Sequence, residues 1–546
     1  MLSRTVIVFA AAAASLQPGV AVPKDPYHVA TLCTPYPVTI GRRVAVSNGA
    51  DLQRALDTAS AGDVIALTPG ATFRPGANDG SFVLRNRSIP ANQWIVIRSA
   101  SPAFDANGSV PPNTRVTKAN VSEMPQIRAT SNNSPAFVTE SGARGYRLVG
   151  LDIGADPAVS QLANLIDLRP ESADIVIDRS YLHGNDSGNF RRGVMLSGAR
   201  LAVIESAVEN FHDGNSDSQA VGGSLGPGPY KIVNNLLEAA SENIMFGGAD
   251  PQAANLVPSD IEIRRNLSTK RLSWKASGVP VKNAFELKNA RRVLVEGNVF
   301  ENVWASGQDG TAILLKSVNQ DGGCPWCVTE YVTFRHNIVR NGGNGLLVNA
   351  AEVGRAGAAL PAKANHIVVD NVLFEDITGK LLRLFGGVAD AAFTHITSRS
   401  NPSGILDAGD AADSNPRLVF KYNIVERRYY GIGAGGDEGE KTLSRNFPSF
   451  AYDQNVLVNT SKGTDQAIAD GALESRYPPR TWVVPGWDAV GIDGATAKLT
   501  SQSRFHAAAS DGKDVGVDTD AITAAQNGPG GSAPCSASAP RVRGPS

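Results

Sequence analysis

The sequence is poor in several residue types. Its 546 residues include only 4 cysteines, 4 methionines and 6 tryptophans, and aromatic residues make up 6% of the chain. Four cysteines are too few to hold a chain of this length together as a disulfide scaffold. The scarcity of large aromatic side chains, beside 55 glycines and 32 prolines, indicates many turns and a core of small and branched aliphatic side chains.

The chain also lacks an excess of charge of either sign. It has 51 Lys and Arg against 52 Asp and Glu, a formal net charge of −1. This balance gives no whole-chain electrostatic reason to expect nucleic acid or an acidic membrane as the partner. Hydrophobic residues make up 42% of the chain, which is too many for a disordered protein and predicts a globular one.

Long apolar runs are missing except near the N-terminus. Arg4 precedes an apolar run from residue 5 to residue 14, and small residues follow up to Ala21. A run of about ten residues is too short to cross a hydrocarbon core of roughly 30 Å. We therefore predict a signal peptide over residues 1–21 and a secreted protein, periplasmic or extracellular, with no membrane span.

The cysteines give one local prediction. Cys324-Pro-Trp-Cys327 has spacing shared by redox and zinc motifs, but no second C-x-x-C or H-x-x-x-H pair completes a zinc site. In an exported protein this spacing favours a disulfide that closes a local loop. The pairing of Cys33 and Cys535 stays open.

A short pattern recurs through the middle of the chain: apolar, any residue, apolar, two mostly polar residues, then Asn or Ser. It occurs at Ile175–Ser180, Leu201–Ser206, Tyr230–Asn235, Ile261–Asn266, Val293–Asn298, Val332–Asn337, more loosely at His366–Asn371, and at Leu418–Asn423. The gap between the last two predicts room for two turns. Four alternating residues predict a short strand with one buried face.

Strands that recur in this way cannot each bury an apolar face alone, so neighbouring turns must stack and share one core. Asn tolerates the left-handed backbone of a tight bend, and its amide can bond to the next Asn in a stack. A second set of strands follows the bends: Gly193–Ser197, Asn243–Gly247, Ala284–Lys288, Ala312–Lys316 and Gly345–Val348. The pattern therefore predicts a solenoid of short parallel strands.

With these repeats and the segment from Val46 to Leu67, the sequence resembles the right-handed parallel β-helix proteins of the pectate-lyase-like superfamily. The resemblance implies an all-β fold, a right-handed parallel β-helix whose first coil is capped by an N-terminal helix. We expect Asp51 to be the N-cap of that helix, with Leu52 and Leu56 on its apolar face.

We assign residues 22–526 to one β-helix domain, closed near its end by the segment 511–525. Residues 527–546, rich in Gly, Pro and Ser, are predicted to form a disordered tail. Segments within Gln219–Lys316 resemble a subgroup of exported bacterial β-helix proteins that are mostly uncharacterised. That resemblance supplies no reaction.

Alternation along the second set of strands predicts a charged outer wall. If Phe285 and Leu287 point inward, Glu286 and Lys288 point outward together, with Lys316 one coil away. The same argument places Arg169 outside, beside Asp167. Loops bring further polar residues to these strands: His183, Arg192, His212, Asp213, Asp217, Gln219 and Glu242.

The wall suggests three functions that act on a polysaccharide partner. A polysaccharide lyase that cleaves a uronic-acid glycan by β-elimination needs a base and a cation at the carboxylate. Lys288 or His183 is our candidate base. Arg169, Arg192 and Lys316 are candidate carboxylate ligands, and His212 and Gln219 further substrate ligands. Calcium is the one candidate cofactor, held by Asp213, Asp217 and Glu242, although no calcium-loop pattern is present.

A glycoside hydrolase is the second hypothesis, with two carboxylates drawn from Asp217, Glu242 and Glu286. The polygalacturonase pattern of Asn-Thr-Asp, Asp-Asp and Gly-His-Gly is absent. The third is a non-catalytic binding or adhesin-like solenoid. The concentration of charged residues between 183 and 316 favours an enzyme, and the basic residues among the carboxylates favour a lyase. We expect a monomer.

Overall fold

The computed structural model describes residues 27, 29–37, 39–76, 80–87, 89–90, 92–400, 402–410 and 412–531. The predicted signal peptide (1–21) and residues 532–546 of the predicted tail lie outside the described residues, as does Cys535.

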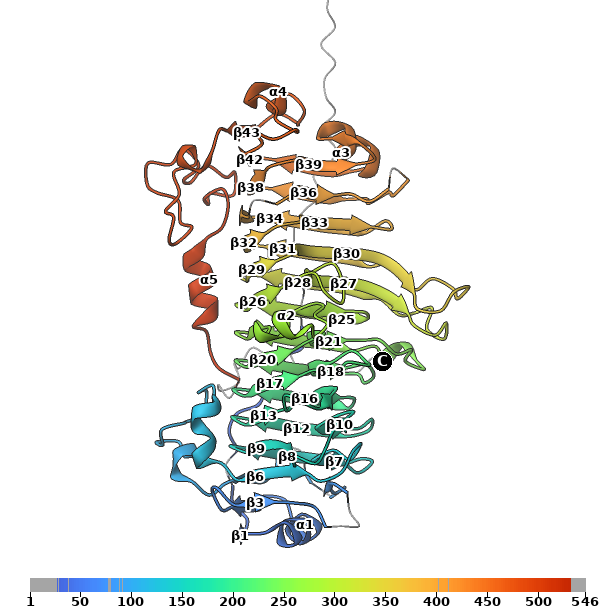
Figure 1. The fold of residues 1–546 in the computed structure, drawn as a ribbon, viewed down its shortest axis with the longest axis vertical. Helices are drawn as coiled ribbons and strands as arrows, with labels where there is room; N and C mark the ends of the chain where they lie inside the picture. The colour runs from blue at the N-terminus through green and yellow to red at the C-terminus, as the bar shows by residue number, and fades with distance from the viewer. Residues whose placement is uncertain are drawn as a thin grey trace, which may run out of the picture.

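Three long sheets wind around one axis to form a right-handed parallel β-helix, as predicted from the repeats (Figure 1). We call them sheets A, B and C. Through the coil, the chain passes from A to B to C and then begins the next turn, so each turn adds one parallel strand to each sheet. The antiparallel pairing of β39 with β40 is an exception at the C-terminal end.

Sheet A contains β1 (Arg43–Val46), β2 (Val64–Leu67), β5 (Ile95–Ser99), β8 (Arg144–Val149), β12 (Ala173–Asp178), β16 (Ala199–Ile204), β19 (Tyr230–Val233), β22 (Ser259–Arg264), β25 (Ala290–Glu296), β28 (Thr329–Arg335), β31 (Asn365–Asp370), β34 (Ala389–Thr394), β37 (Leu418–Lys421) and β41 (Phe450–Asp453). Sheet B contains β3 (Thr72–Phe73), β6 (Gln126–Ala129), β9 (Asp152–Ala155), β13 (Tyr181–His183), β17 (Ala207–Phe211), β20 (Leu236–Ala239), β23 (Leu267–Thr269), β26 (Val299–Val303), β29 (Ile338–Gly342), β32 (Leu373–Ile377), β35 (Thr397–Arg399), β38 (Ile424–Arg427), β42 (Asn455–Asn459) and β43 (Thr481–Val484).

Sheet C contains β4 (Phe82–Leu84), β7 (Phe137–Thr139), β11 (Ile166–Leu168), β15 (Arg192–Leu196), β18 (Gln219–Gly223), β21 (Glu242–Phe246), β24 (Phe285–Leu287), β27 (Thr311–Asn319), β30 (Asn344–Val353), β33 (Lys380–Phe385), β36 (Gly404–Asp407), β39 (Tyr430–Ala434) and β40 (Asp437–Glu438). A separate pair joins β10 (Gln161–Leu162) to β14 (Asn189–Phe190). The helices are α1 (Gly49–Thr58), α2 (Ser273–Ser277), α3 (Glu440–Asn446), α4 (Asp470–Glu474) and α5 (Thr519–Gln526), with 3-10 turns at Pro102–Phe104, Lys118–Glu123, Ala254–Leu256 and Trp487–Ala489.

The predicted strands and their inward residues are confirmed. Phe285, Leu287, Ile313 and Leu315 belong to one continuous apolar core that runs from Val46 in the first coil to Tyr477 near the last. The gap before Leu418 holds the additional strand β34, which makes the two predicted turns.

A buried asparagine ladder, made of Asn235, Asn266, Asn298 and Asn337, joins successive turns after sheet A. Each side-chain amide donates to the next side-chain oxygen at 2.9–3.0 Å. The same oxygen also accepts the backbone N–H of the preceding ladder residue, for example the N–H of Asn235 on Asn266 at 2.9 Å. The predicted amide stack is therefore confirmed.

The left-handed position of the bend differs from the prediction. The residue before each ladder asparagine adopts it, as in Arg265 (φ 57°), Gly297 (φ 67°) and His336 (φ 53°). Strand pairing of Arg335 with Asp370 places Asn371 (φ 52°) in register with His336, one residue before the ladder. The loose repeat was thus assigned one residue out of register, since an Asn suits either position.

The N-terminal cap is confirmed with a different capping residue. Helix α1 buries Leu52 and Leu56 against the first coil, at the lower end of Figure 1. Its N-cap is Asn48, whose side-chain oxygen accepts the backbone N–H of Asp51 at 2.9 Å. Asp51 instead lies in the first turn, where its negative charge suits the helix dipole.

The first and the last segments that the structure describes run along the outside of the coil. The backbone N–H of Tyr27 bonds to Thr333 of β28, and that of Ala30 bonds to Asp260 of β22, so the N-terminal segment lies along sheet A. Helix α5 runs back along the side of the coil (Figure 1), with Ile522 packed against Leu373 of sheet B. The segment that was expected to close the coil thus lies along its side.

The first residues of the predicted tail continue this path. The carbonyl of Gly531 accepts hydrogen bonds from Thr34 Oγ1 at 2.6 Å and Lys231 Nζ at 3.0 Å, and its N–H donates to Glu205 at 2.6 Å. The predicted Cys324–Cys327 disulfide is present, and Cys33 is also disulfide-bonded. In the described part of the chain no helix is long and apolar enough to span a membrane.

Candidate functional site

Parallel pairing aligns the outward residues of sheet C in rows that run along the coil. Successive residues of a row lie about 4.8 Å apart, one on each strand. In the first row, Arg192 pairs with Gln219 and Gln219 with Glu242. The pairing of Ile244 with Phe285 places Asn283 next in the same row. We call Arg192, Gln219, Glu242 and Asn283 the polar row.

A second row lies three residues further along each strand. Met195 pairs with Gly222, Gly222 with Met245, and Met245 with Glu286. The alternation that predicted an outward Glu286 is therefore confirmed, and Glu286 lies one strand away from Glu242.

Glu242 is almost completely buried, with 1% of its surface exposed. Its Oε2 accepts a hydrogen bond from Gln219 Nε2 at 2.7 Å. Burial raises the pKa of Glu242 to about 8, with further contributions from the charges of Glu286 and Asp217. Glu242 is therefore a carboxylic acid that keeps its proton at neutral pH.

Glu286 is equally buried but has a cationic partner. Lys316 Nζ lies 3.4 Å from Glu286 Oε1 and 3.3 Å from Glu352 Oε2. Burial acts to lower the pKa of Lys316, but Glu286 and Glu352 outweigh it, and the pKa is raised. Lys316 therefore stays protonated and neutralises Glu286, so its ammonium is already engaged by two carboxylates.

Arg192 differs from Lys316, because its side chain forms no hydrogen bond or ion pair with any described residue. The charges of Glu242, Asp217 and Asp167 act on it only at longer range. Its side chain lies over Gly222, where an added Cβ would come within 3.4 Å of Arg192 Cδ. Burial lowers the pKa of Arg192 to about 10, and Arg191 acts in the same direction. A partly buried guanidinium without a partner is costly unless an anion joins it.

Other members of the polar row also have unused hydrogen-bonding capacity. Three oxygens on successive turns of the coil are buried without a hydrogen-bond partner: Gln219 Oε1, Glu242 Oε1 and Asn283 Oδ1. Buried oxygens of this kind normally have a partner. Because these oxygens have almost no exposed surface, a hydroxyl group satisfies them only by entering the row itself.

Lys288 and Asp217 lie at the borders of this row. Lys288 has no side-chain partner among the described residues, and its Nζ would lie 3.9 Å from a Cβ added to Gly248. Asp217 forms an ion pair with Lys282. The structure thus gathers Arg192, Gln219, Glu242, Glu286, Lys288 and Lys316 on sheet C, with Asp217 at the edge.

Two residues near the row were missed at the sequence level. Lys282 directly precedes Asn283, and aligning the strand Ala284–Lys288 with Asn243–Gly247 would have placed Asn283 beside Glu242. Lys270 is buried behind the row and donates to the carbonyls of Ala239, Ser241 and Asn283 and to Asn243 Oδ1, at 2.6–2.8 Å. Burial lowers the pKa of Lys270 to about 7.

Three predicted site residues lie elsewhere. His183 is in β13 of sheet B, where it bonds to Asp152 Oδ1 at 3.1 Å and stacks on Tyr181. His212 follows β17 of the same sheet, bonds to the carbonyl of Asn185 and contacts Trp274 edge-on. Arg169 is on sheet C, but its side chain is 57% exposed and pairs with Asp167. His183 therefore does not share a wall with Lys288.

The proposed calcium ligands do not converge. Asp213 Oδ1 accepts the backbone N–H groups of Asn215 and Ser216, so Asp213 shapes its own loop. Asp217 is neutralised by Lys282, and Glu242 keeps its proton at neutral pH. Within the ranges that the structure describes, no group of three or more His, Cys, Asp or Glu side chains is arranged to hold a metal ion. These residues do not fit a calcium site.

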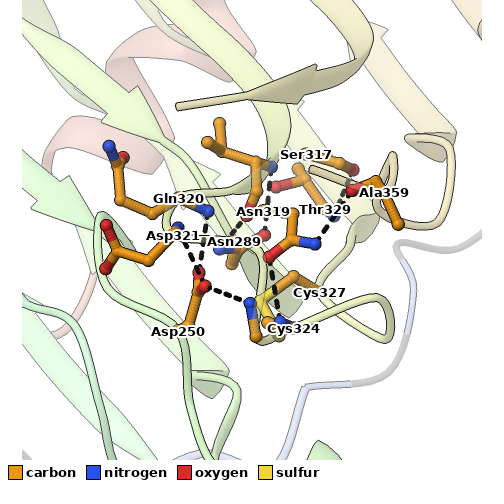
Figure 2. The surroundings of a disulfide bond; sticks show 12 residues. Asp250, Asn289, Ser317, Asn319, Gln320, Asp321, Cys324, Cys327, Thr329 and Ala359 are labelled. Carbon is orange, nitrogen blue, oxygen red and sulfur yellow. Dashed lines mark hydrogen bonds between the residues drawn. A yellow bond between two sulfur atoms is a disulfide. The ribbon is translucent and has the colours of Figure 1, made fainter. Parts of the chain in front are cut away.

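Figure 2 shows the loop that follows β27, which contains the disulfide. Asp250, from the loop after β21, accepts the backbone N–H groups of Gln320, Asp321 and Gly323 at 2.7–2.9 Å. The Cys324–Cys327 disulfide lies in the same loop, and Cys324 N–H bonds to Asn319 Oδ1. The loop is thus tied to two turns of the coil.

Comparisons with known proteins match the fold alone. No protein-family model and no curated protein matches the chain. A family 6 polysaccharide lyase from Pseudopedobacter saltans is 13% identical over 87% of this chain and 99% of that chain, with a TM-score of 0.41. An alginate lyase from a Paenibacillus species is 15% identical over 64% of this chain and 99% of that one, with a TM-score of 0.37.

A family 28 exopolygalacturonase from Yersinia enterocolitica is also similar, with 12% identity over 82% of this chain and 79% of that chain and a TM-score of 0.37. Lyases and a hydrolase are therefore among the similar structures, and function has to be argued from the site.

Proposed function

We propose that the protein is an enzyme that cleaves a uronic-acid polysaccharide by β-elimination on the outer face of sheet C. The observation that carries this proposal is Arg192, a partly buried guanidinium over Gly222 whose side chain forms no hydrogen bond or ion pair with any described residue. A carboxylate on a sugar ring is a suitable bidentate partner for it. The unsatisfied oxygens of the polar row suit the hydroxyl groups of the same ligand.

The reaction assigns a role to each nearby group. Arg192 binds the sugar carboxylate and stabilises the negative charge that develops there when the adjacent carbon loses its proton. Lys288 acts as the base and takes that proton. The electron pair forms the ring double bond, the glycosidic carbon–oxygen bond breaks, and Glu242 gives its proton to the leaving oxygen. Gln219 orients Glu242 through its 2.7 Å hydrogen bond.

Arg192→Ala and Arg192→Lys test the carboxylate site. With a uronate oligosaccharide, calorimetry is expected to show about ten- to hundredfold weaker binding for Arg192→Ala, since a charged hydrogen-bond pair is lost. Arg192→Lys should bind the oligosaccharide more tightly than Arg192→Ala but more weakly than wild type, because Lys cannot form bidentate hydrogen bonds to a carboxylate. The same oligosaccharide with its carboxyls reduced should bind wild type and Arg192→Ala alike. Equal binding of the intact uronate to wild type and Arg192→Ala would refute the carboxylate site.

A glycoside hydrolase is the second candidate, favoured by one observation. Glu242 and Glu286 lie on adjacent strands, and their surroundings separate them into a protonated acid and a carboxylate neutralised by Lys316. Such a pair is what acid-assisted hydrolysis requires. New reducing ends without ultraviolet-absorbing unsaturated product would favour this candidate over the lyase.

Export of the protein is a further proposal, supported by the apolar run and small residues of the N-terminal segment 1–21. A fusion of this segment to a reporter enzyme, assayed in the medium and periplasm, tests it.

A further inference from the structure

A large cavity lies on the same sheet as the polar row but at the C-terminal end of the coil. Its volume is about 1110 Å³, and it is bounded by β36, β39, β40, α3 and the segment 465–468. Six strand steps separate β21, which carries Glu242, from β39. At about 4.8 Å per step, this is about 29 Å along the coil. The proposed elimination uses none of the residues of this cavity.

Tyr430 presents an aromatic surface to the cavity. It lies in the continuation of the polar row, where Lys380 pairs with Gly404 and Gly404 with Tyr430. Its side chain is 51% exposed, although its neighbour Ile432 belongs to the core. A large aromatic ring held outward in a concave site is a typical platform for the apolar face of a sugar.

The ring of Tyr430 is held in place by its neighbours along the row. Lys380 Nζ lies 4.8 Å from the ring centroid. Gly404, between them, leaves the room for this contact, because a Cβ there would come within 3.0 Å of Lys380 Nζ. The platform is therefore preorganised, which lowers the entropic cost of binding.

Polar groups around the platform are free to bind hydroxyls. Glu440 and Lys441 line the cavity, and neither side chain has a partner among the described residues. Arg427 and Arg476, in contrast, are both paired with Glu438. Free groups of both signs suit a hydroxyl-rich ligand better than a strongly anionic one.

We propose that this cavity is a second saccharide-binding site that takes a distant unit of the same polymer cleaved at the polar row. Tyr430 stacks on the sugar ring, and the free polar side chains bind its hydroxyls. The identity of the polymer rests on the proposed function, whereas the presence of a saccharide site does not. A chain must span about 29 Å to occupy both sites, so only long substrates gain from the cavity.

Tyr430→Ala, with Tyr430→Phe as the conservative variant, tests the proposal. Affinity electrophoresis in gels that contain a polyuronate measures polymer binding, and kcat/KM is measured on the polymer and on a trisaccharide too short to reach both sites. Tyr430→Ala should bind the polymer about three- to tenfold more weakly, as loss of one aromatic stacking contact implies. Tyr430→Phe should bind nearly as wild type, and trisaccharide cleavage should be unchanged in both variants. Ile40→Ala, an exposed apolar residue at the opposite end, is the surface control.

Unchanged polymer binding by Tyr430→Ala would overturn the proposal. Equal losses with polymer and trisaccharide would also overturn it, because the cavity would then bind short saccharides or support the fold. If wild type binds the polymer through Tyr430 but cleaves none of it, the second site stands and the lyase proposal fails. If the polymer is cleaved and Tyr430→Ala behaves as wild type, the lyase proposal stands and the second site fails.

Discussion

Glu242 combines an unfavourable environment with a useful protonation state. It is buried, one oxygen has no partner, and burial with the neighbouring Glu286 and Asp217 raises its pKa from 4.5 to about 8. In the unfolded chain the same side chain loses its proton near pH 4.5. Between pH 4.5 and pH 8, the carboxyl of Glu242 takes up a proton when the chain folds. The free energy of unfolding therefore falls as pH rises.

Glu242→Gln should remove this pH dependence. Relative to wild type, the free energy of unfolding of Glu242→Gln rises by up to about 1.4 kcal/mol for each pH unit between pH 4.5 and pH 8. Urea unfolding of both proteins across this range gives the difference. If Glu242 donates the proton to the leaving oxygen, the variant also loses activity while becoming more stable at pH 8.

Glu440→Gln is the control, since Glu440 is an exposed carboxylate on α3. It should leave the pH dependence of stability as in wild type. A stability difference between wild type and Glu242→Gln that stays constant from pH 4.5 to pH 8 would contradict the raised pKa.

The candidate site could be predicted only where it depends on strand alternation. Glu286 and Lys316 follow from the inward positions of Phe285 and Leu315, because neighbouring residues of a strand point to opposite faces. His183 was misplaced because the sequence does not say which of three sheets a short strand joins. The unpartnered state of Arg192 was out of reach, since it depends on side chains from neighbouring turns.

The asparagine ladder connects the turns of the coil through buried hydrogen bonds. Asn266 alone accepts from the backbone N–H and side chain of Asn235 and donates to Ile232 O and Asn298 Oδ1. Each such bond contributes modestly, but a buried N–H left without a partner costs about 1–3 kcal/mol. The ladder therefore stabilises the turns that carry the polar row.

Asn266→Ala should lower the free energy of unfolding by about 2–4 kcal/mol, because it leaves the buried N–H of Asn235 and a neighbouring oxygen without hydrogen-bond partners. Guanidinium unfolding measures the change. Asn215→Ala, in an exposed loop, should change stability by less than about 0.5 kcal/mol. Equal stabilities for Asn266→Ala and Asn215→Ala would contradict a stabilising ladder.

Most of the fold was predictable because one pattern repeats, and each repeat imposes the same strand and bend. The ladder itself follows from the recurrence of Asn. What the pattern could not distinguish was the ladder position from the left-handed position beside it, since Asn suits both. Asn371 was therefore placed one residue out of register. Asn48 and Asp51 were confused for a similar reason, as both residue types cap helices.

The first described segment, α5 and the site occupy different sides of the coil. The N-terminal segment lies along sheet A, α5 packs against sheet B, and the polar row is on sheet C. These long-range contacts cross more than a hundred residues, as in the bond from Asp518 N–H to Asn371 Oδ1 at 2.6 Å. Local sequence patterns carry no information about such contacts.

Ile522→Asp should destabilise the protein without changing the site. It places a charge in the apolar contact between α5 and sheet B, with an expected loss of about 2–4 kcal/mol. Thermal unfolding measures this loss. Activity per folded molecule should equal that of wild type. Ala524→Asp, on the exposed side of α5, is the matched control and should unfold nearly as wild type. A loss of specific activity in Ile522→Asp at a temperature where it is folded would contradict this separation.

The proposed activity of sheet C is β-elimination at the glycosidic bond of a uronic-acid polymer. The most direct measurement follows the purified protein on a polyuronate panel, including alginate and pectate, by ultraviolet absorbance and reducing ends together. We expect one unsaturated end for every new reducing end on at least one polymer. Lys288→Met should lower this rate by about a hundredfold or more, as loss of a general base implies. Reducing ends without absorbance, or no cleavage of any polyuronate, would contradict it.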